Sequence, residues 1–364
     1  MNFFYRNTQL PKNSDLLKQI NNAAMRLHNK LKQLDINSLR ISDYNKRYLI
    51  NYRKNITSIL HKYCYIFAWS IVDTSIALDQ FVFIDYGGGS GILSLLAKEY
   101  GINTVVYNDI YETSCSDARI IALTLGNEAD YYVHGDIDTV IDLVKTKSLR
   151  STALASYDVI EHIYNLEAFL TNLKDVSPLP FTAVMASGAN PLNPVKKRRF
   201  MRYHMNREYK NQEKKWGHKE RDCLKSYFDV RREIISSHVP TLLDAEKYQL
   251  AMSTRGLIES EIKECVEEYL RSGKVLRRPD HPTNTCDPYT GNWAERLIDI
   301  DHVRKILLDA GFEVSVISGY YGGSNSILKR LVGYILNTLI AIHKDNGLIF
   351  APFFVIRAKK TYRS

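Results

Sequence analysis

The sequence predicts an α/β fold in which helices cover both faces of a mainly parallel sheet. Five short apolar runs alternate with helix-like runs, and the runs start at 81, 104, 131, 153 and 181, which is the spacing of βαβ units. The first run, Phe81–Ile84, passes through Asp85 and a series of glycines into a helix-like run over 92–100. A strand that turns through glycines into a helix is typical of nucleotide-type binding in doubly wound folds.

The glycine-rich turn places Gly87, Gly89 and Gly91 at alternate positions after Asp85. Glycine allows the backbone to approach a ligand closely, and the start of the following helix offers unpaired N–H groups. The dinucleotide fingerprint G-x-G-x-x-G requires a small residue where this chain has Ile92. The turn therefore predicts a nucleotide-type ligand other than a dinucleotide.

Acidic residues follow the next three strand-like runs. Asp109 ends the run over 104–109, about 20 residues beyond the glycines, where an acid can accept both hydroxyls of a ribose. Asp136 ends the run over 131–136, and Asp158 follows the run that begins at Ala153. In open α/β sheets, ligands bind at the carboxyl ends of the strands, so we expect these acids at one site.

Together, the D-x-G-x-G-x-G turn, Asp109, the Gly-Asp pair before residue 137 and the run D-V-I-E-H from Asp158 resemble the motifs of class I S-adenosylmethionine (SAM)-dependent methyltransferases. The resemblance covers residues 81 to about 190 and 300 to 360, under half of the chain. It implies a Rossmann-like sheet of seven strands in the order 3-2-1-4-5-7-6, with the last strand antiparallel. Strand-like runs at 312–318 and 349–358 and helical runs at 301–310 and 326–343 agree with such an ending.

The resemblance also implies SAM as the cofactor and a set of residues that bind it. In that family, the Gly-Asp carboxylate after the third strand accepts from the adenine amino group, and we expect Tyr86 near the methionine part of SAM. The implied cofactor-binding residues are Asp85, Tyr86, Gly87, Gly89, Gly91, Asp109, Ile110, Asp136, Ile137 and Asp158.

Three segments are expected around this core. Residues 1–78 form a helical N-terminal extension, residues 79–190 with 300–364 form the SAM-binding domain, and residues 191–299 form a helical, basic insertion. The insertion leaves from the carboxyl end of a strand, so we expect it to act as a lid and to select the acceptor. Tyr44, Tyr48 and Tyr52 share one helical face, either as core or as a wall that stacks on a sugar or another ring.

Methyl transfer to a hydroxyl requires removal of a proton, for which His162, Glu161, His204 and His281 are candidate bases. The run Asp158-x-x-Glu161-His162 is similar to the metal-binding E-x-x-E-H of small-RNA 2′-O-methyltransferases, with Asp in place of the first Glu. This similarity implies Mg²⁺, Mn²⁺ or Zn²⁺ on Asp158, Glu161 and His162, with His204 as a further ligand. The alternative is a metal-free site in which these residues pack under the cofactor.

The positive charge is concentrated in one segment. Residues 196–232 contain 14 Lys and Arg and 5 Asp and Glu, an excess equal to the net charge of +9 of the whole chain. Such a segment is either a solvated helical face or a surface that attracts an anionic glycan, a nucleotide sugar, RNA or an anionic membrane surface. The longest apolar run, 331–342, is too short to span a bilayer and no signal peptide is evident, so a cytoplasmic protein is expected.

The favoured function is methylation of a sugar hydroxyl, in a nucleotide sugar or in a bacterial surface polysaccharide. The aromatic extension, the basic insertion and the carboxylate–histidine run after the fourth strand favour it. Three alternatives stay open: an RNA 2′-O-methyltransferase, a methyltransferase of small molecules in secondary metabolism, and a SAM-binding partner subunit without catalytic activity.

Overall fold

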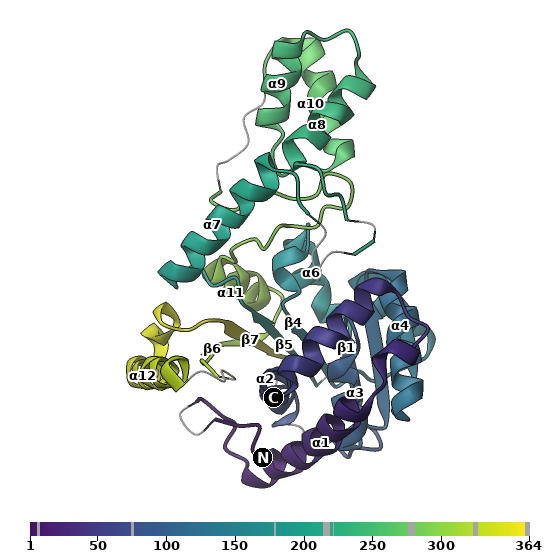
Figure 1. Cartoon of the computed structure of the whole chain (residues 1–364), viewed down its shortest axis with the longest axis vertical. Helices are drawn as coiled ribbons and strands as arrows, with labels where there is room; N and C mark the ends of the chain where they lie inside the picture. The colour runs from purple at the N-terminus through teal and green to yellow at the C-terminus, as the bar shows by residue number, and fades with distance from the viewer. Residues whose placement is uncertain are drawn as a thin grey trace. The chain divides into compact units, whose positions relative to one another are not determined.

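A computed structural model describes eight stretches of the chain (Figure 1). They are residues 1–5, 8–73, 76–177, 180–213, 219–220, 222–275, 281–322 and 327–360. The chain forms two compact units, which are described separately. The first unit comprises Met1–Ile160, Glu167–Asn193 and Asp299–Ser364, and the second comprises Glu161–Leu166 and Pro194–Ile298. The predicted insertion, 191–299, thus overlaps the second unit, which also takes in the segment after the fourth strand.

The first unit contains a seven-stranded sheet in the order β3-β2-β1-β4-β5-β7-β6 (Figure 1). Strands β1 to β5 pair in parallel, whereas β7 is antiparallel to both β5 and β6. The predicted Rossmann-like fold and its strand order are therefore confirmed. The strands are β1 (Val82–Tyr86), β2 (Thr104–Asp109), β3 (Tyr131–His134), β4 (Ala153–Tyr157), β5 (Phe181–Ser187), β6 (Glu313–Ser318) and β7 (Phe354–Lys360).

Helices connect and cover these strands. They are α1 (Ser14–Gln33), α2 (Asp43–Ile71), α3 (Ile92–Tyr100), α4 (Glu112–Leu125), α5 (Ile137–Thr146), α6 (Leu166–Asn172), α11 (Ile300–Asp309) and α12 (Ile327–His343). The helices α1, α2, α3 and α4 share one hydrophobic core with the sheet. Side chains of a strand alternate between the two faces of a sheet, so Phe83, Val105 and Val184 enter this core. Their neighbours Ile84 and Val106 point to the other face and are also buried.

The N-terminal extension consists of α1, a 3₁₀ turn (Ile36–Ser38) and α2. Ser42 caps α2 by accepting a hydrogen bond from the Asn45 N–H. Helix α2 is kinked at Asn55, whose φ and ψ are −118° and 17°. The part after the kink is buried and packs on β4 and β5, whereas the part before it carries the three spaced tyrosines.

The last strand begins later than predicted. The sequence predicts a strand over 349–358, but β7 starts at Phe354 and Ile349 ends a 3₁₀ helix, Lys344–Ile349. Pro352 lies between the two and has no N–H to donate to a strand partner. The N–H of Ala351 instead turns back to the Gly347 carbonyl, 3.1 Å away. The apolar residues before Pro352 therefore belong to a turn.

The second unit is mainly helical, as predicted for the insertion. It contains α7 (Pro194–Tyr209), α8 (Tyr227–His238), α9 (Asp244–Ser253) and α10 (Glu259–Ser272), followed by irregular chain over 281–298. Its core is formed by apolar side chains of α8, α9 and α10, among them Ile235, Leu250 and Val266. Within the described residues of both units, no helix combines the length and the apolar character needed to cross a bilayer.

Candidate cofactor site and catalytic residues

The glycine-rich turn between β1 and α3 has a backbone that other residues could not easily adopt. Gly87, Gly89 and Gly91 have φ values of 69°, 54° and 77°. A Cβ on Gly87 would lie 2.6 Å from Cγ2 of Val159, and a Cβ on Gly88 would lie 2.6 Å from the ring of Tyr107. A Cβ on Gly89 would meet no atom within 4 Å. The turn is thus closely packed on two sides and open at Gly89.

Gly88 was not singled out by the sequence pattern, although three consecutive glycines were the available signal. Its N–H donates to the Asn108 carbonyl at 2.9 Å, and the Tyr107 hydroxyl donates to the Gly89 carbonyl. These contacts attach the turn to the end of β2. The packing requirement explains why glycine also occupies the position between the alternate glycines.

Asp85, at the end of β1, holds the start of α3. Gly91 precedes this helix without a side-chain cap, and Oδ2 of Asp85 accepts from the Ser94 N–H at 2.9 Å and from its hydroxyl at 2.7 Å. Burial of the carboxyl raises the pKa of Asp85 to about 7, against the lowering effect of Ser94. The structure therefore places this predicted residue beneath the turn, where it takes over the role of an N-cap.

Asp109 joins the second strand to the glycine turn. Its Oδ2 accepts from the Gly89 N–H at 3.0 Å, and its Oδ1 accepts from the Tyr111 N–H at 2.8 Å. Each carboxylate oxygen can accept a second hydrogen bond. The adjacent Ile110 is 53% exposed, although it follows a buried strand directly. An acid and an exposed apolar side chain thus stand together at the end of β2.

Asp136 follows β3 and caps α5. Its Oδ1 accepts from the N–H groups of Asp138 and Thr139, at 3.1 and 3.3 Å, and its side chain is exposed. Asn108 aligns the neighbouring strand ends, because its amide donates to the Gly135 carbonyl at 2.9 Å. Ile137 is buried in the first turn of α5. The Gly-Asp pair is therefore fixed beside Asp109.

The α2 tyrosines lie close to these strand ends. The start of α2 is attached to α4, because Asp117 accepts from the Asn45 amide at 2.8 Å. Burial, Tyr48 and the Asp109 carboxylate raise the pKa of Tyr44. Burial raises the pKa of Tyr52, and the negative charges of Asp158 and Asp85 add to this effect. Tyr44 is buried, as expected for core packing, whereas Tyr48 and Tyr52 are half-buried, and their contact with a sugar or another ring stays a prediction.

Tyr86 packs its ring against Phe169 of α6, with ring centroids 5.0 Å apart. Asp158, after β4, has a φ of 53°, which is unusual for a residue other than glycine. Its Oδ1 accepts from the Gly188 N–H at 3.0 Å, and its own N–H donates to the Ala186 carbonyl at 2.9 Å. Asp158 is thus held at the ends of β4 and β5 with its side chain exposed.

His162 belongs to the second unit, where the irregular chain over 285–296 fixes it. Its Nδ1 donates to the Trp293 carbonyl at 2.8 Å, and the Trp293 N–H donates to the His162 carbonyl at 3.3 Å. The Trp293 ring stacks on Tyr164, with centroids 5.4 Å apart. With the proton of the neutral ring on Nδ1, Nε2 carries a lone pair, which is the arrangement of a general base. The sequence pattern alone did not connect His162 with Trp293.

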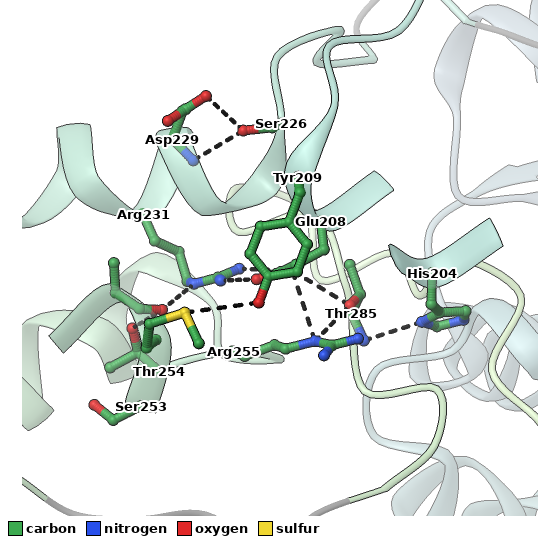
Figure 2. Close-up of polar contacts among 12 residues, drawn as sticks. His204, Glu208, Tyr209, Ser226, Asp229, Arg231, Ser253, Thr254, Arg255 and Thr285 are labelled. Atoms are coloured by element: carbon green, nitrogen blue, oxygen red, sulfur yellow. Dashed lines mark hydrogen bonds and ion pairs between the residues drawn. The ribbon is translucent and has the colours of Figure 1, made fainter. Parts of the chain in front are cut away.

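His204 has a different environment in the second unit (Figure 2). The ring is fully buried, its Nδ1 accepts from the Thr285 N–H at 3.1 Å, and its Nε2 donates to the Glu295 carbonyl at 3.1 Å. Burial lowers the pKa of His204 to about 3. Both nitrogens are used by the backbone, so these contacts argue against the predicted roles of His204 as a base or metal ligand.

The predicted metal site is not assembled among the residues that the structure describes. In those stretches, no group of three or more His, Cys, Asp and Glu side chains is placed to hold a metal ion. Glu161 is fully buried, Asp158 is exposed, and His162 is half-buried. Because the three residues of this motif differ so much in burial, they are not expected to bind one cation together.

The basic segment is only partly a surface. Lys197, Arg198, Arg199 and Arg202 on α7 are exposed. Arg207 is buried over the ring of Tyr227, and Arg231 is buried in an ion pair with Glu208 (Figure 2). Residues 214–218 and Arg221, which contribute three of its positive charges, lie outside the described stretches. Two arginines of the basic segment, Arg207 and Arg231, are thus part of the interior of the second unit and not of an exposed basic surface.

No family model matches this chain, and no curated relative matches it either. Among solved structures, it is similar to magnesium protoporphyrin IX methyltransferase from Synechocystis, with 13% identity, a TM-score of 0.38, and coverage of 86% of this chain and 93% of the other. A SAM-dependent methyltransferase from Mesorhizobium loti gives 11% identity, a TM-score of 0.36, and coverage of 77% and 91%. Similarity this low carries no conclusion about activity, and the fold assignment rests on the strand order.

Proposed function

We propose that the protein binds SAM at the carboxyl ends of β1, β2 and β3 and transfers its methyl group to a hydroxyl. The observation that carries this proposal is the glycine turn, which is open at Gly89 and held from behind by Asp85 and Asp109. A backbone that is open toward one side and packed on the others is suited to close contact with a ligand.

The positions of the acids support SAM over a nucleotide that carries phosphates. Asp85, Asp109 and Asp136 end three neighbouring strands, and such an edge repels phosphate groups. The methionine part of SAM bears an ammonium group and a sulfonium, and its ribose offers two hydroxyl donors. In the proposed pose, the second lone pairs of Asp109 bind the ribose, Asp136 accepts from the adenine amino group, and Ile110 covers the adenine ring.

For the chemical step, we assign the proton transfer to His162. Methyl transfer from a sulfonium is an in-line displacement that forms the oxygen–methyl bond as the sulfur–methyl bond breaks. The acceptor hydroxyl loses its proton to Nε2 of His162, while the Nδ1–H continues to donate to the Trp293 carbonyl. No metal is required in this scheme, because imidazole accepts the proton and the leaving thioether is neutral.

The proposed acceptor is a sugar hydroxyl, in a nucleotide sugar or a surface polysaccharide. The exposed cations Lys197, Arg198, Arg199 and Arg202 suit an anionic acceptor, and the half-buried ring of Tyr48 suits a sugar ring. An RNA 2′-O-methyltransferase would share the cations. It is the weaker proposal, because the metal motif that favoured it is not assembled among the described residues.

The experiment combines titration and turnover on the intact protein. We expect S-adenosylhomocysteine to bind in isothermal titration calorimetry, and labelled methyl groups to reach nucleotide sugars or polysaccharide in preference to RNA. His162→Asn keeps an amide donor for the Trp293 carbonyl but removes the basic nitrogen, so it should bind the cofactor normally and lose about 100-fold or more in turnover. His302→Gln is the matched control, since His302 is an exposed histidine paired with Glu167.

Each proposal has its own contrary result. Absence of binding heat and of a thermal shift with S-adenosylhomocysteine would refute the proposal that the protein binds SAM. Normal binding without transfer to any acceptor would favour the partner-subunit alternative. Full turnover by His162→Asn would exclude His162 as the base.

A further inference from the structure

Helix α12 of the first unit is amphipathic, but most of its large apolar side chains face outward and its side toward the domain contains a polar residue. Its buried positions are Gly333, Asn337 and Ile340. Asn337 clamps the preceding backbone, because Oδ1 accepts from the Tyr321 N–H at 2.7 Å and Nδ2 donates to the Tyr321 carbonyl at 2.9 Å. A Cβ on Gly333 would lie 3.2 Å from Cβ of Tyr321, so the helix lies close against this segment. The side toward the domain thus contains the polar clamp.

The outer side of α12 is apolar and exposed. A surface helix normally turns its apolar stripe toward the core, whereas here most of the large apolar side chains face away from the domain. A contiguous exposed apolar surface of this kind marks an interaction site. The exposed fractions are 83% for Ile327, 70% for Leu328, 57% for Leu331, 47% for Val332, 62% for Tyr334, 52% for Ile335 and 67% for Ile342.

The charges on α12 are all positive. Its sequence contains no Asp or Glu, and Lys329 and Arg330 are exposed in its first turn. Successive residues of a helix are rotated by about 100°. On this basis, Lys329 and Arg330 lie on opposite sides of the helix, between the apolar side and the side that faces the domain, each roughly 120° to 140° from the centre of the apolar side. Long cationic side chains in such positions can bury their stems and extend their charges to a polar boundary.

We propose that α12 binds the surface of an anionic lipid bilayer, lying in the plane of the interface. The apolar side enters the boundary between headgroups and acyl chains, and the two flanking cations contact anionic headgroups. A second copy of the chain is a poorer occupant, because its α12 would offer no carboxylate to Lys329 or Arg330.

The test measures flotation of the full chain with vesicles. Wild-type protein should float with vesicles of equal parts phosphatidylglycerol and phosphatidylcholine, and should remain unbound with phosphatidylcholine alone. The double variant Leu331→Gln with Ile335→Gln alters two exposed neighbours on the apolar side and should lower the partition coefficient by tenfold or more. The matched control is Leu123→Gln with Leu308→Gln, two isolated exposed leucines on α4 and α11, which should bind as wild type.

A second pair of variants tests the charges. Lys329→Gln with Arg330→Gln should lower binding to anionic vesicles by about 25-fold, since each cation near an anionic surface accounts for about fivefold. Arg304→Gln with Lys305→Gln removes two adjacent exposed cations from α11 and should have a much smaller effect. Added salt should weaken the binding of the wild type more than that of the α12 charge variant.

Three results would overturn the proposal. The first is no flotation of the wild type with anionic vesicles. The second is an equal loss of binding in the α12 and α11 charge variants, which would indicate only a general electrostatic attraction. The third is a dimer of the wild type in solution that Leu331→Gln with Ile335→Gln converts to a monomer, which would assign the apolar side to a second copy.

Discussion

The buried carboxyl of Asp85 should make the stability of the first unit depend on pH in an unusual direction. Its folded pKa is about 7, against an ordinary value of 3.8, so the folded protein holds this proton more tightly than the unfolded chain. The contribution of the Asp85 carboxyl to the free energy of unfolding is therefore largest at acidic pH. It falls as the pH rises from about 4 to about 7, and it is constant above that range.

The magnitude follows from the difference between the two pKa values. Each unit corresponds to about 1.4 kcal/mol, so the full loss is about 4 kcal/mol, of which about 3 kcal/mol falls between pH 5 and pH 8. Asp85→Asn keeps an acceptor for the Ser94 N–H and hydroxyl but carries no proton that titrates. The variant should therefore be close to wild type at pH 5 and more stable at pH 8.

The assay is urea denaturation of both proteins at pH 5 and pH 8 without cofactor, and the quantity of interest is their difference. Taking the difference removes other titrating groups such as His204, whose lowered pKa destabilises the protein in acid. A variant that differs from wild type by the same amount at both pH values would refute the reasoning. So would a variant that is less stable than wild type at pH 8.

The same carboxyl links pH to cofactor binding under the proposed function. The ammonium group of the cofactor favours the ionised form of Asp85, so affinity should rise with pH up to about 7. The ionised fraction changes from about a tenth at pH 6 to about three quarters at pH 7.5, which predicts roughly eightfold tighter binding of S-adenosylhomocysteine. In Asp85→Asn, calorimetry should show a much flatter pH profile, and an unchanged slope would disprove the linkage.

Three further substitutions test other parts of the structure. Asp109→Asn removes charge from the proposed ribose contacts and should weaken S-adenosylhomocysteine about 10- to 100-fold in calorimetry, while equal affinity would exclude that contact. Gly87→Ala places a Cβ against Val159 at a φ of 69°, so urea denaturation should show a loss of about 1–3 kcal/mol, and wild-type stability would contradict the packing. Arg231→Met leaves the buried carboxylate of Glu208 without its main partner and should cost the second unit about 3 kcal/mol in the same assay, whereas a neutral result would show that Arg255 alone suffices.

Much of the first unit could be predicted because its determinants are local. The runs that became β2 and β5 have the predicted bounds. Strand composition, glycine spacing and caps act over a few residues, so they can be read from the chain. The predicted start of the last strand, at residue 349, was wrong because the apolar run was taken to continue through Pro352, whereas β7 starts at Phe354.

The contacts within the second unit could not be predicted in this way. The pattern treated His162 and His204 alike, as histidines near an expected site. The fold gives His162 one backbone partner and leaves a lone pair on Nε2, whereas it encloses His204 between Thr285 and the Glu295 carbonyl. These partners lie 81 to 131 residues away along the chain, which is beyond the reach of any local pattern.

The sequence by itself determined the order of elements, the glycine turn and the acids that follow three strands, because each depends on neighbours along the chain. Only the tertiary structure decided which of the charged and polar side chains are buried, which nitrogen of His162 is available, and that α12 turns its apolar side outward. Burial and hydrogen-bond partners depend on residues that folding brings together from distant positions, and they set the pKa of Asp85 and the surface that α12 presents.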